Sequence, residues 1–512
     1  MKQYRKLPGK RECCWTATAS ATSYARLKHS GSTDVAIVGA GIVGLTAAYL
    51  LTRAGLSVTV LEARQVGRQV TGRSTAKVTS QHTLIYRHLI DSVGIANAQR
   101  YADANRSGVE LIRSWVDKLA IDCDFEPKDA YVYTCDPSRR SEIEKEGEAA
   151  RRVGFEADVL AKAPLPFETV RALRFRDQAQ FNPVRYLIGL AGAIEAAGGR
   201  IFENTRVTSV DSGSRWRIET GRCRLDAEHV ILATNFPIAG PLSFDRITRP
   251  RCHIAMAFRT TSASAIDGMF IGIDNPTHSL RMGRDREGPL LVVLGPSFIT
   301  GHDGDVAARF RELEDWVRRN LPAGDVAWHW ANEDYDTADR VPFVGASSKK
   351  EPGLYIATGF NGWGISNGTA AGMMIADQIR GRANPWASLY DPTRRARKDF
   401  NKGGDSQSRV ASLKDIRPGE GGVIKLGKGN IAVRKDANGS LHALSASCTH
   451  EGCTVTWNNA DQTWDCPCHG SIFSADGQVI HGPAVDPLIP KKLPPNWLKR
   501  RSNSTRRSKS KK

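Results

Sequence analysis

The sequence predicts a large α/β domain with an α+β domain inserted in it, followed by a small all-β domain. Three features support this fold class: a strand, glycine-rich turn and helix near the N-terminus, similar buried strands far along the chain, and short alternating strands and turns near the C-terminus. A chain of 512 residues is too long for one hydrophobic core, so two or three domains are expected.

The first element is the β-branched run at residues 34–38, which passes directly into a glycine-rich turn. That turn consists of Gly39-Ala40-Gly41-Ile42-Val43-Gly44. Residues 45–53 follow with helical composition, and a second strand, residues 57–61, ends at Glu62. Strand, tight turn, helix, strand and acid in this order predict a βαβ unit.

Two more buried strands, residues 229–234 and 353–359, lie much further along the chain. The second leads through another glycine-rich turn into a helix that includes residues 373–379. Because strand-to-helix units lie at both ends of the first 390 residues, we expect one sheet assembled from distant segments.

The intervening sequence has a different pattern. Residues 109–153 are rich in acid–base pairs and predict helix, whereas residues 249–259 and 289–295 predict strands of a separate sheet. We interpret these segments as an inserted, substrate-covering domain. After a basic, polar linker, residues 421–489 combine short strands with turn pairs such as Asn438-Gly439, which predicts an all-β domain.

The predicted domain boundaries follow these changes in composition. They are an N-terminal segment 1–33, an α/β domain 34–390 with its inserted parts at roughly 80–160 and 245–335, a linker 391–415, an all-β domain 416–490, and a basic, disordered tail 491–512.

The net charge of +18 is concentrated at the C-terminal end of the chain. The tail from Lys491 to Lys512 holds ten Lys or Arg and no acid, and without it the net charge is about +8, an ordinary surplus for a protein of this size. We therefore expect no specific nucleic-acid partner. No apolar run follows the basic residues near the N-terminus, and glycines interrupt the most apolar stretch, residues 35–51, so neither a secretory signal nor a transmembrane segment is expected.

The ten cysteines are unevenly distributed. Four of them, Cys448, Cys453, Cys466 and Cys468, fall in one short segment, while others are scattered. This distribution indicates a reduced, cytoplasmic chain with one metal site.

The glycine-rich turn after the first strand has the chemistry of a dinucleotide site. Gly39 forms the turn, Gly41 leaves room for the pyrophosphate, and Gly44 lets helix and strand pack. The helix N-terminus then faces the anion, and Glu62 is placed to accept hydrogen bonds from the ribose hydroxyls. The alternative interpretation is that these glycines serve only the packing of the helix on the strand.

Together with residues 64–77 and the late turn that ends at Gly364, this unit resembles the D-amino-acid oxidase and glycine oxidase superfamily of flavoproteins, over roughly residues 34–380. The resemblance implies FAD as the cofactor, with the segment after Glu62 beside the isoalloxazine ring and a middle strand, around Val207, in contact with the adenine. It also implies that the late turn aims a helix N-terminus at the flavin pyrimidine edge. Ser74 and Thr75 are candidate contacts to the flavin ring, and a purely structural role in the loop stays open for both. The cofactor-binding residues that it implies are Gly39, Ala40, Gly41, Ile42, Gly44, Glu62, Ser74, Thr75, Val207, Thr234, Gly359, Gly362 and Gly364.

The second motif pairs Cys448-Thr-His450 with Cys466-Pro-Cys468-His469. Two thiolates suit one iron of a [2Fe–2S] cluster and two imidazoles suit the other. Cys₂His₂ is also a zinc set, but each loop here mixes the two ligand types, unlike a zinc finger.

The residues around these ligands resemble the Rieske family of the cytochrome bc₁ type. The resemblance implies that Cys448 and Cys466 bind one iron, that His450 and His469 bind the other, and that Cys453 and Cys468 form a disulfide between the two loops. It also implies a hydrogen bond from Ser471 to cluster sulfur. High-potential members have a tyrosine two residues further on, where this chain has Phe473.

Other candidates are weaker. Arg281 precedes a predicted strand and is a candidate partner for a substrate carboxylate. The alternative is an ordinary solvent-exposed arginine, because most arginines lie on the surface. Trp363 is a candidate for the substrate cavity or for core packing. His82 and His88 lie near the segment after Glu62 without a carboxylate at facial-triad spacing, so we interpret them as packing or surface residues rather than ligands of a mononuclear iron.

Two redox motifs on one chain predict an FAD-dependent oxidoreductase that oxidises a small substrate and passes electrons singly to a Rieske cluster. The resemblance to the amino-acid oxidases implies an amine or amino acid as that substrate. A one-electron donor or acceptor protein is then the expected partner. Two alternatives stay open. One is an electron-transfer reductase or carrier, and the other is a non-enzymatic redox sensor.

Overall fold

A computed structural model describes residues 7–493 except 243, 261–265, 395–411 and 428. The linker and tail predictions fall largely on residues outside this set. The described residues divide into two compact units, one within residues 7–299 and 307–394 and the other within residues 300–306 and 412–493. They are taken in turn.

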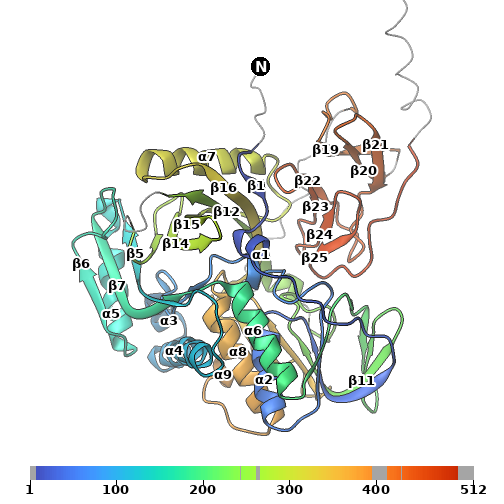
Figure 1. Cartoon of the computed structure of the whole chain (residues 1–512), viewed down its shortest axis with the longest axis horizontal. Helices are drawn as coiled ribbons and strands as arrows, with labels where there is room; N and C mark the ends of the chain where they lie inside the picture. The colour runs from blue at the N-terminus through green and yellow to red at the C-terminus, as the bar shows by residue number, and fades with distance from the viewer. Residues whose placement is uncertain (1–6, 243, 261–265, 395–411, 428, 494–512) are drawn as a thin grey trace, which may run out of the picture. The chain divides into compact units, whose positions relative to one another are not determined.

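The first unit contains the predicted sheet of distant segments (Figure 1). β2 lies between β3 and β11 in parallel register, with Ala36 opposite both Thr59 and Val230. The prediction of one sheet from both ends of the unit is thus confirmed. The strand order is β17 (Phe343–Ala346), β18 (Leu354–Thr358), β11 (Arg224–Leu232), β2 (Gly31–Val38), β3 (Val58–Leu61) and β8 (Arg200–Phe202), with β10 (Trp216–Glu219) on β11 and β9 (Ser209–Asp211) on β10.

Helices cover this sheet because their small and apolar residues pack against one another. α2 (Ile42–Arg53) is buried along most of its length and packs on α8 (Gly364–Ile379) and α6 (Pro183–Ala196). At the start of α6 the Asn182 side chain accepts hydrogen bonds from the next backbone N–H groups, which is a stable helix start. The same unit contains α1 (Cys14–Thr18), η1 (Thr71–Arg73), α3 (Ile85–Val93), α4 (Ile95–Lys118), η2 (Pro137–Arg139), α5 (Arg140–Arg152), η3 (Phe244–Arg246), α7 (Val306–Asn320) and α9 (Ala387–Tyr390).

A second, larger sheet forms the α+β part of this unit. It contains the antiparallel trio β16, β12 and β15, so the two strands predicted at residues 249–259 and 289–295 are neighbours. Its strand order is β1 (Lys10–Arg11), β16 (Val326–Thr337), β12 (Thr248–Arg259), β15 (Gly288–Ile299), β14 (Ser279–Asp285), β13 (Met269–Gly272), β5 (Glu126–Thr134), β7 (Arg171–Gln180) and β4 (Lys77–Val78), with β6 (Ala157–Leu160) on β7.

The continuous helix expected at residues 109–153 is wrong. α4 ends at Lys118, and β5 pairs with β7 and β13 before α5 begins. Residues 130–134 are Ala-Tyr-Val-Tyr-Thr and are all buried. Aromatic and β-branched side chains favour a buried strand, whereas the acid–base pairs lie in the helices on either side.

The second unit contains two small antiparallel sheets, as the all-β prediction required. One consists of β19 (Gly421–Leu426), β20 (Gly429–Lys435) and β21 (Leu441–Ser445). The other consists of β22 (Thr456–Asn458), β23 (Thr463–Asp465), β24 (Ile472–Ser474) and β25 (Val479–His481). Trp457 faces Trp464 across β22 and β23, with ring centroids 4.8 Å apart.

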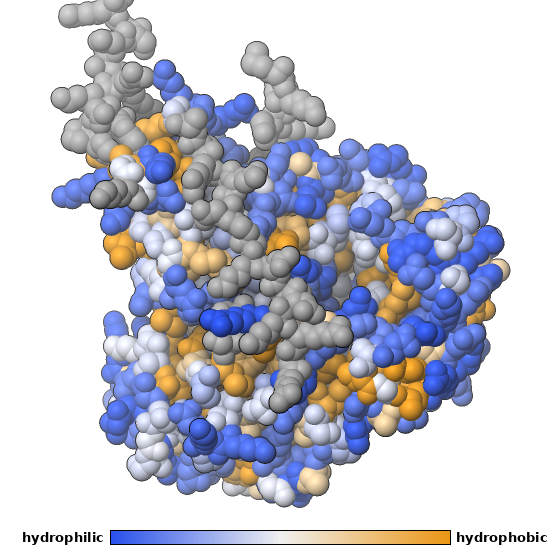
Figure 2. Space-filling view, turned by 180° about the vertical axis from the view of Figure 1, so that it is seen from behind, coloured by the Kyte–Doolittle hydropathy of each residue, from blue (hydrophilic) through white to orange (hydrophobic). Residues whose placement is uncertain are grey.

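Large apolar side chains are mostly buried in the described residues, where the exposed ones are Ile95, Leu426 and Ile489. Figure 2 shows the same balance on one face, with small groups of hydrophobic residues among hydrophilic ones. Among the described helices, none has the length and apolar character needed to cross a membrane.

Candidate functional site

The glycine-rich turn after β2 requires glycine at two positions. Gly39 has φ +108°, and a Cβ there would lie 2.5 Å from the carbonyl oxygen of Ala233 at the end of β11. A Cβ on Gly44 would lie 2.0 Å from the carbonyl oxygen of Gly39. The turn is therefore compact, and helix α2 packs directly on the strand, as a dinucleotide-binding turn requires.

The N-terminus of α2 is the end that would face a pyrophosphate. Gly41 is its N-cap, with no side-chain cap. The N–H of Ile42 donates to Thr71 Oγ1 at 3.2 Å, and a Cβ on Gly41 would lie 3.2 Å from the same oxygen. The helix N–H groups and the Thr71 hydroxyl are hydrogen-bond donors at this end of α2, and Gly41 leaves space beside them. This arrangement fits the pyrophosphate of FAD.

Glu62 lies directly after β3 and is 7 % exposed. Its carboxylate accepts hydrogen bonds from the N–H groups of Ala40 and Arg64, both at 2.9 Å. Burial raises the pKa of Glu62, although these two hydrogen bonds oppose the shift. Each oxygen of a carboxylate accepts more than one hydrogen bond, so the group still fits the ribose hydroxyls.

The other residues expected near FAD are dispersed over several connections. Ser74 Oγ accepts from the N–H of Ala76, and Thr75 lies beside it in the loop before β4. Thr234, after β11, donates to the carbonyl of Phe236 at 2.6 Å. The expectation of a strand around Val207 is wrong: Val207 is buried in the connection between β8 and β9.

The late glycine turn lies at the start of α8. Gly359 and Gly362 have φ values of +76° and +82°, and Gly364 is the first helical residue. The N–H of Gly362 donates to Asp334 Oδ2 at 2.6 Å. No sequence motif indicates Asp334, which is 6 % exposed; burial raises the pKa of its carboxyl group to about 6. Its only sequence signal is a charge at a buried strand position.

The weaker candidates, Arg281 and Trp363, differ in burial. Arg281 is 2 % exposed, so it is not a surface arginine. Its Nη2 donates to the carbonyl of Phe181 at 3.0 Å, and its guanidinium stacks 4.6 Å from the ring of Trp15. Trp363 is partly buried and stacks on the buried His82, with ring centroids 4.7 Å apart. Its role in a substrate cavity or in core packing stays a prediction.

The second unit presents two loops with the same backbone pattern. In the first, the N–H of Cys448 donates to the carbonyl of Cys453, and the N–H of Gly452 returns to the carbonyl of Cys448. In the second loop, the N–H of Cys466 donates to the carbonyl of Ser471, and the N–H of Gly470 donates to the carbonyl of Cys466. Each loop therefore holds a Cys and, two or three residues later, a His in equivalent turns.

The two histidines point toward each other. His450 Nδ1 lies 3.2 Å from His469 Nδ1, with the rings perpendicular. Two nitrogens bound to one tetrahedral metal at about 2.0–2.1 Å would be about 3.4 Å apart. The spacing of the two nitrogens therefore fits two ligands of a single iron.

The two cysteines also act as a pair. A hydrogen bond from Cys466 lowers the pKa of Cys448 to about 7, and the same contact raises that of Cys466. Ser471 contributes a further hydrogen bond to Cys448, while its Oγ accepts from the N–H of Ala484 at 3.1 Å. Two buried thiol ligands opposite two imidazoles fit a cluster with cysteines on one iron.

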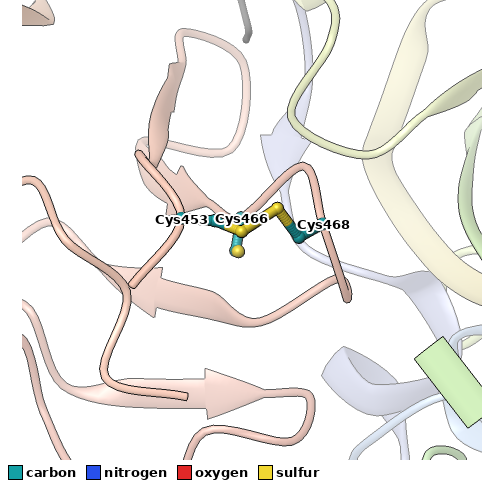
Figure 3. Close-up of side chains that lie close together, drawn as sticks. All are labelled: Cys453, Cys466 and Cys468. Carbon is teal, nitrogen blue, oxygen red and sulfur yellow. A yellow bond between two sulfur atoms is a disulfide. The ribbon is translucent and has the colours of Figure 1, made fainter. Parts of the chain in front are cut away.

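A disulfide joins the two loops between Cys453 and Cys468, as the resemblance implied (Figure 3). The sulfur of Cys466 lies beside this bond, and the three sulfurs fall within 4.8 Å of one another. Disulfide sulfurs are not thiolates, so this group is not the metal site. Cys448, His450, Cys466 and His469 stay the predicted ligands.

Two protein families match this chain, one in its α/β part and one in its C-terminal all-β part. The sequence model of the FAD dependent oxidoreductase family matches residues 34–378, and that of the Rieske [2Fe-2S] domain matches residues 406–494. The chain belongs to the FAD-dependent oxidoreductase family. It carries a C-terminal Rieske domain, and its cofactors are FAD and a [2Fe–2S] cluster.

Individual relatives match either nearly the whole chain or about 70 % of it. The Rieske 2Fe-2S iron-sulfur protein YhfW of Bacillus subtilis is 32 % identical over 495 residues, 93 % of this chain and 97 % of YhfW. Gamma-glutamylputrescine oxidoreductase of Escherichia coli is 24 % identical over 71 % of this chain and 88 % of its own length. The structure of glycine oxidase from Geobacillus kaustophilus has a TM-score of 0.59, with 17 % identity, over 72 % of this chain and all of that one, which shows a shared fold.

Proposed function

We propose that this FAD-dependent oxidoreductase oxidises a small amine or amino acid and passes the electrons singly from FAD to the Rieske cluster. The observation that carries the proposal is the presence of both cofactor sites on one chain. Gly41 and the α2 N-terminus fit a pyrophosphate, and the Nδ1 atoms of His450 and His469 lie at the spacing of two iron ligands. FAD accepts an electron pair from a substrate and can release the two electrons one at a time, whereas a [2Fe–2S] centre accepts one electron. The two cofactors together therefore convert a two-electron oxidation into single-electron transfers.

We further propose the roles of the site residues. The turn from Gly39 to Gly44 and Glu62 bind the pyrophosphate and ribose, residues 64–77 form the flavin loop, and the turn from Gly359 to Gly364 faces the flavin. Cys448, Cys466, His450 and His469 hold the cluster. Relatives named for an amine or amino-acid substrate, such as gamma-glutamylputrescine oxidoreductase, support this class of small molecule.

Anaerobic titration of the purified full chain with a library of amines and amino acids tests the proposal. A true substrate should bleach the flavin absorbance and then produce the EPR signal of the reduced cluster. Gly41→Val is the matched control, because it should remove FAD and leave the cluster in place. With that variant, the same substrate should reduce nothing.

Two other outcomes would replace the proposal. Reduction by a protein donor but by no small molecule would identify an electron-transfer reductase whose Rieske domain serves a partner protein. Flavin bleaching without any cluster reduction would show that the two cofactors do not exchange electrons.

A further inference from the structure

We infer that the N-terminal strap, residues 7–30, holds the flavin loop in its FAD-binding conformation and thereby controls FAD retention. The FAD oxidoreductase family match begins at residue 34, so the strap precedes the part of the chain that the family shares. The inference rests on the proposed assignment of residues 64–77 as the flavin loop.

The flavin loop crosses the N-terminus of α2, where an anion would bind. Thr71 Oγ1 accepts from the N–H of Ile42, and the N–H of Gly67 donates to the carbonyl of Ala40. On one side β16 holds the loop, because Trp330 Nε1 donates to the carbonyl of Arg73 at 2.8 Å. A shift of the loop would therefore move groups that line the pyrophosphate end of the site.

The strap holds the loop through backbone carbonyls. Trp15, 1 % exposed, donates from Nε1 to the carbonyl of Ser74 at 2.9 Å. In the reverse direction Arg68 donates to three strap carbonyls, those of Thr16, Ala19 and Ser20.

A buried carboxylate connects the same two segments further along. Glu203, after β8, has 0 % exposure. One of its oxygens accepts from Thr22 Oγ1 of the strap and from the N–H of Val66 of the loop, at 2.8 Å for the latter. The other accepts from the N–H of Tyr24 at 3.1 Å. Loss of the strap would leave a buried carboxylate with fewer donors, which is costly in a protein interior.

The strap is fixed at both of its ends. β1 adds to the edge of β16 in parallel register, with Lys10 opposite Trp328. At the other end, Leu27 is buried and its N–H donates to Thr205 Oγ1 at 3.1 Å. Since Thr205 follows Glu203 closely and donates its N–H to the carbonyl of Glu62, the strap reaches the ribose end of the site as well.

Two variants of the full chain test the inference. Trp15→Phe keeps a ring over Arg281 and removes the hydrogen bond to Ser74, and Arg68→Met removes three bonds to the strap. We expect the Kd for FAD, measured by reconstitution of the apoprotein, to rise roughly fivefold to tenfold for Trp15→Phe and more than tenfold for Arg68→Met. The control is Lys28→Ala, at an exposed strap residue, which should leave Kd within twofold.

Hydrogen exchange of the apoproteins separates a local role from general destabilisation. Amides of residues 65–74 should exchange faster in the two variants, while those of β2 and β11 keep their protection. Unchanged Kd in both variants, or loss of protection throughout the unit, would overturn the inference. Absence of FAD binding by the wild type would instead overturn the proposed FAD site.

Discussion

Replacement of Ser471 by alanine should lower the reduction potential of the Rieske cluster. The side chain is fully buried at 0 % exposure, and its oxygen accepts from the N–H of Ala484 at 3.1 Å. The hydroxyl proton is therefore left to donate toward sulfur, and the hydrogen bond between Ser471 and Cys448 agrees with this. A donor to cluster sulfur stabilises the reduced, more negative state, so its removal favours the oxidised state.

The size of the effect follows from one hydrogen bond. A bond of ~1–2 kcal/mol corresponds to roughly 40–90 mV for a one-electron couple. Phe473→Tyr should act in the opposite direction by a similar amount, because Phe473 is buried in the same apolar cluster as Cys448 and lacks a hydroxyl. Without that hydroxyl the wild-type potential should lie below that of the respiratory Rieske proteins and above that of plant-type ferredoxins.

An EPR-monitored redox titration of the full chain measures these potentials. Ser474→Ala is a suitable control, because Ser474 Oγ accepts from the N–H of Gln478 in a turn of the same unit. The reasoning fails if Ser471→Ala retains the cluster at the wild-type potential, or shifts it no more than the control does. An unchanged or lower potential in Phe473→Tyr would mean that this side chain does not face cluster sulfur.

Three further predictions concern binding and stability. Gly41→Val should abolish FAD binding and preserve the cluster spectrum, because a side chain there meets Thr71 and the pyrophosphate position; normal flavin content would show that the site is misplaced. Cys453→Ser should destabilise the second unit by about 3 kcal/mol, the value for a loop near the 15-residue separation of this disulfide, and denaturant unfolding with iron analysis would measure it. Burial lowers the pKa of Lys77 to about 7, against the usual value of 10.5 for an exposed lysine. Between these two pH values the unfolded chain binds more protons than the folded chain, so the free energy of unfolding of the wild type should rise with pH. In Lys77→Met this rise should be smaller than in the wild type by up to ~2–3 kcal/mol between about pH 7.5 and pH 9.5. An equal rise in the variant and the wild type would contradict the lowered pKa.

Short-range patterns predicted the parts of the fold that local sequence encodes. Glycines at 39, 41 and 44 lie between a β-branched run and a helical one, and their order alone specifies strand, turn and helix. The same holds for the Cys and His pairs, because each loop carries its own ligands. The strand β5 was missed because its five buried residues lie between two charged helices, and the surrounding acid–base pairs obscured it.

Contacts between distant segments could not be predicted in this way. Asp334 reaches the N–H of Gly362 across 28 positions, and Trp15 reaches Ser74 across 59. No periodicity or spacing encodes such a pair, because each partner belongs to a different element. The domain boundaries and the roles of the FAD-site residues stay predictions.

The sequence by itself determined the two cofactor motifs, the α/β and all-β fold classes, and the order of the domains. These depend on residues close together in the chain, whose backbone geometry and ligand chemistry are local. Only the tertiary structure decided that Arg281 is buried, that Trp363 stacks on His82, and that Nδ1 of His450 meets Nδ1 of His469 at 3.2 Å. It also decided that residues 7–30 form hydrogen bonds with residues 64–77. Burial and long-range hydrogen bonding are properties of the assembled core, because they arise when sheets and helices from separate segments pack together.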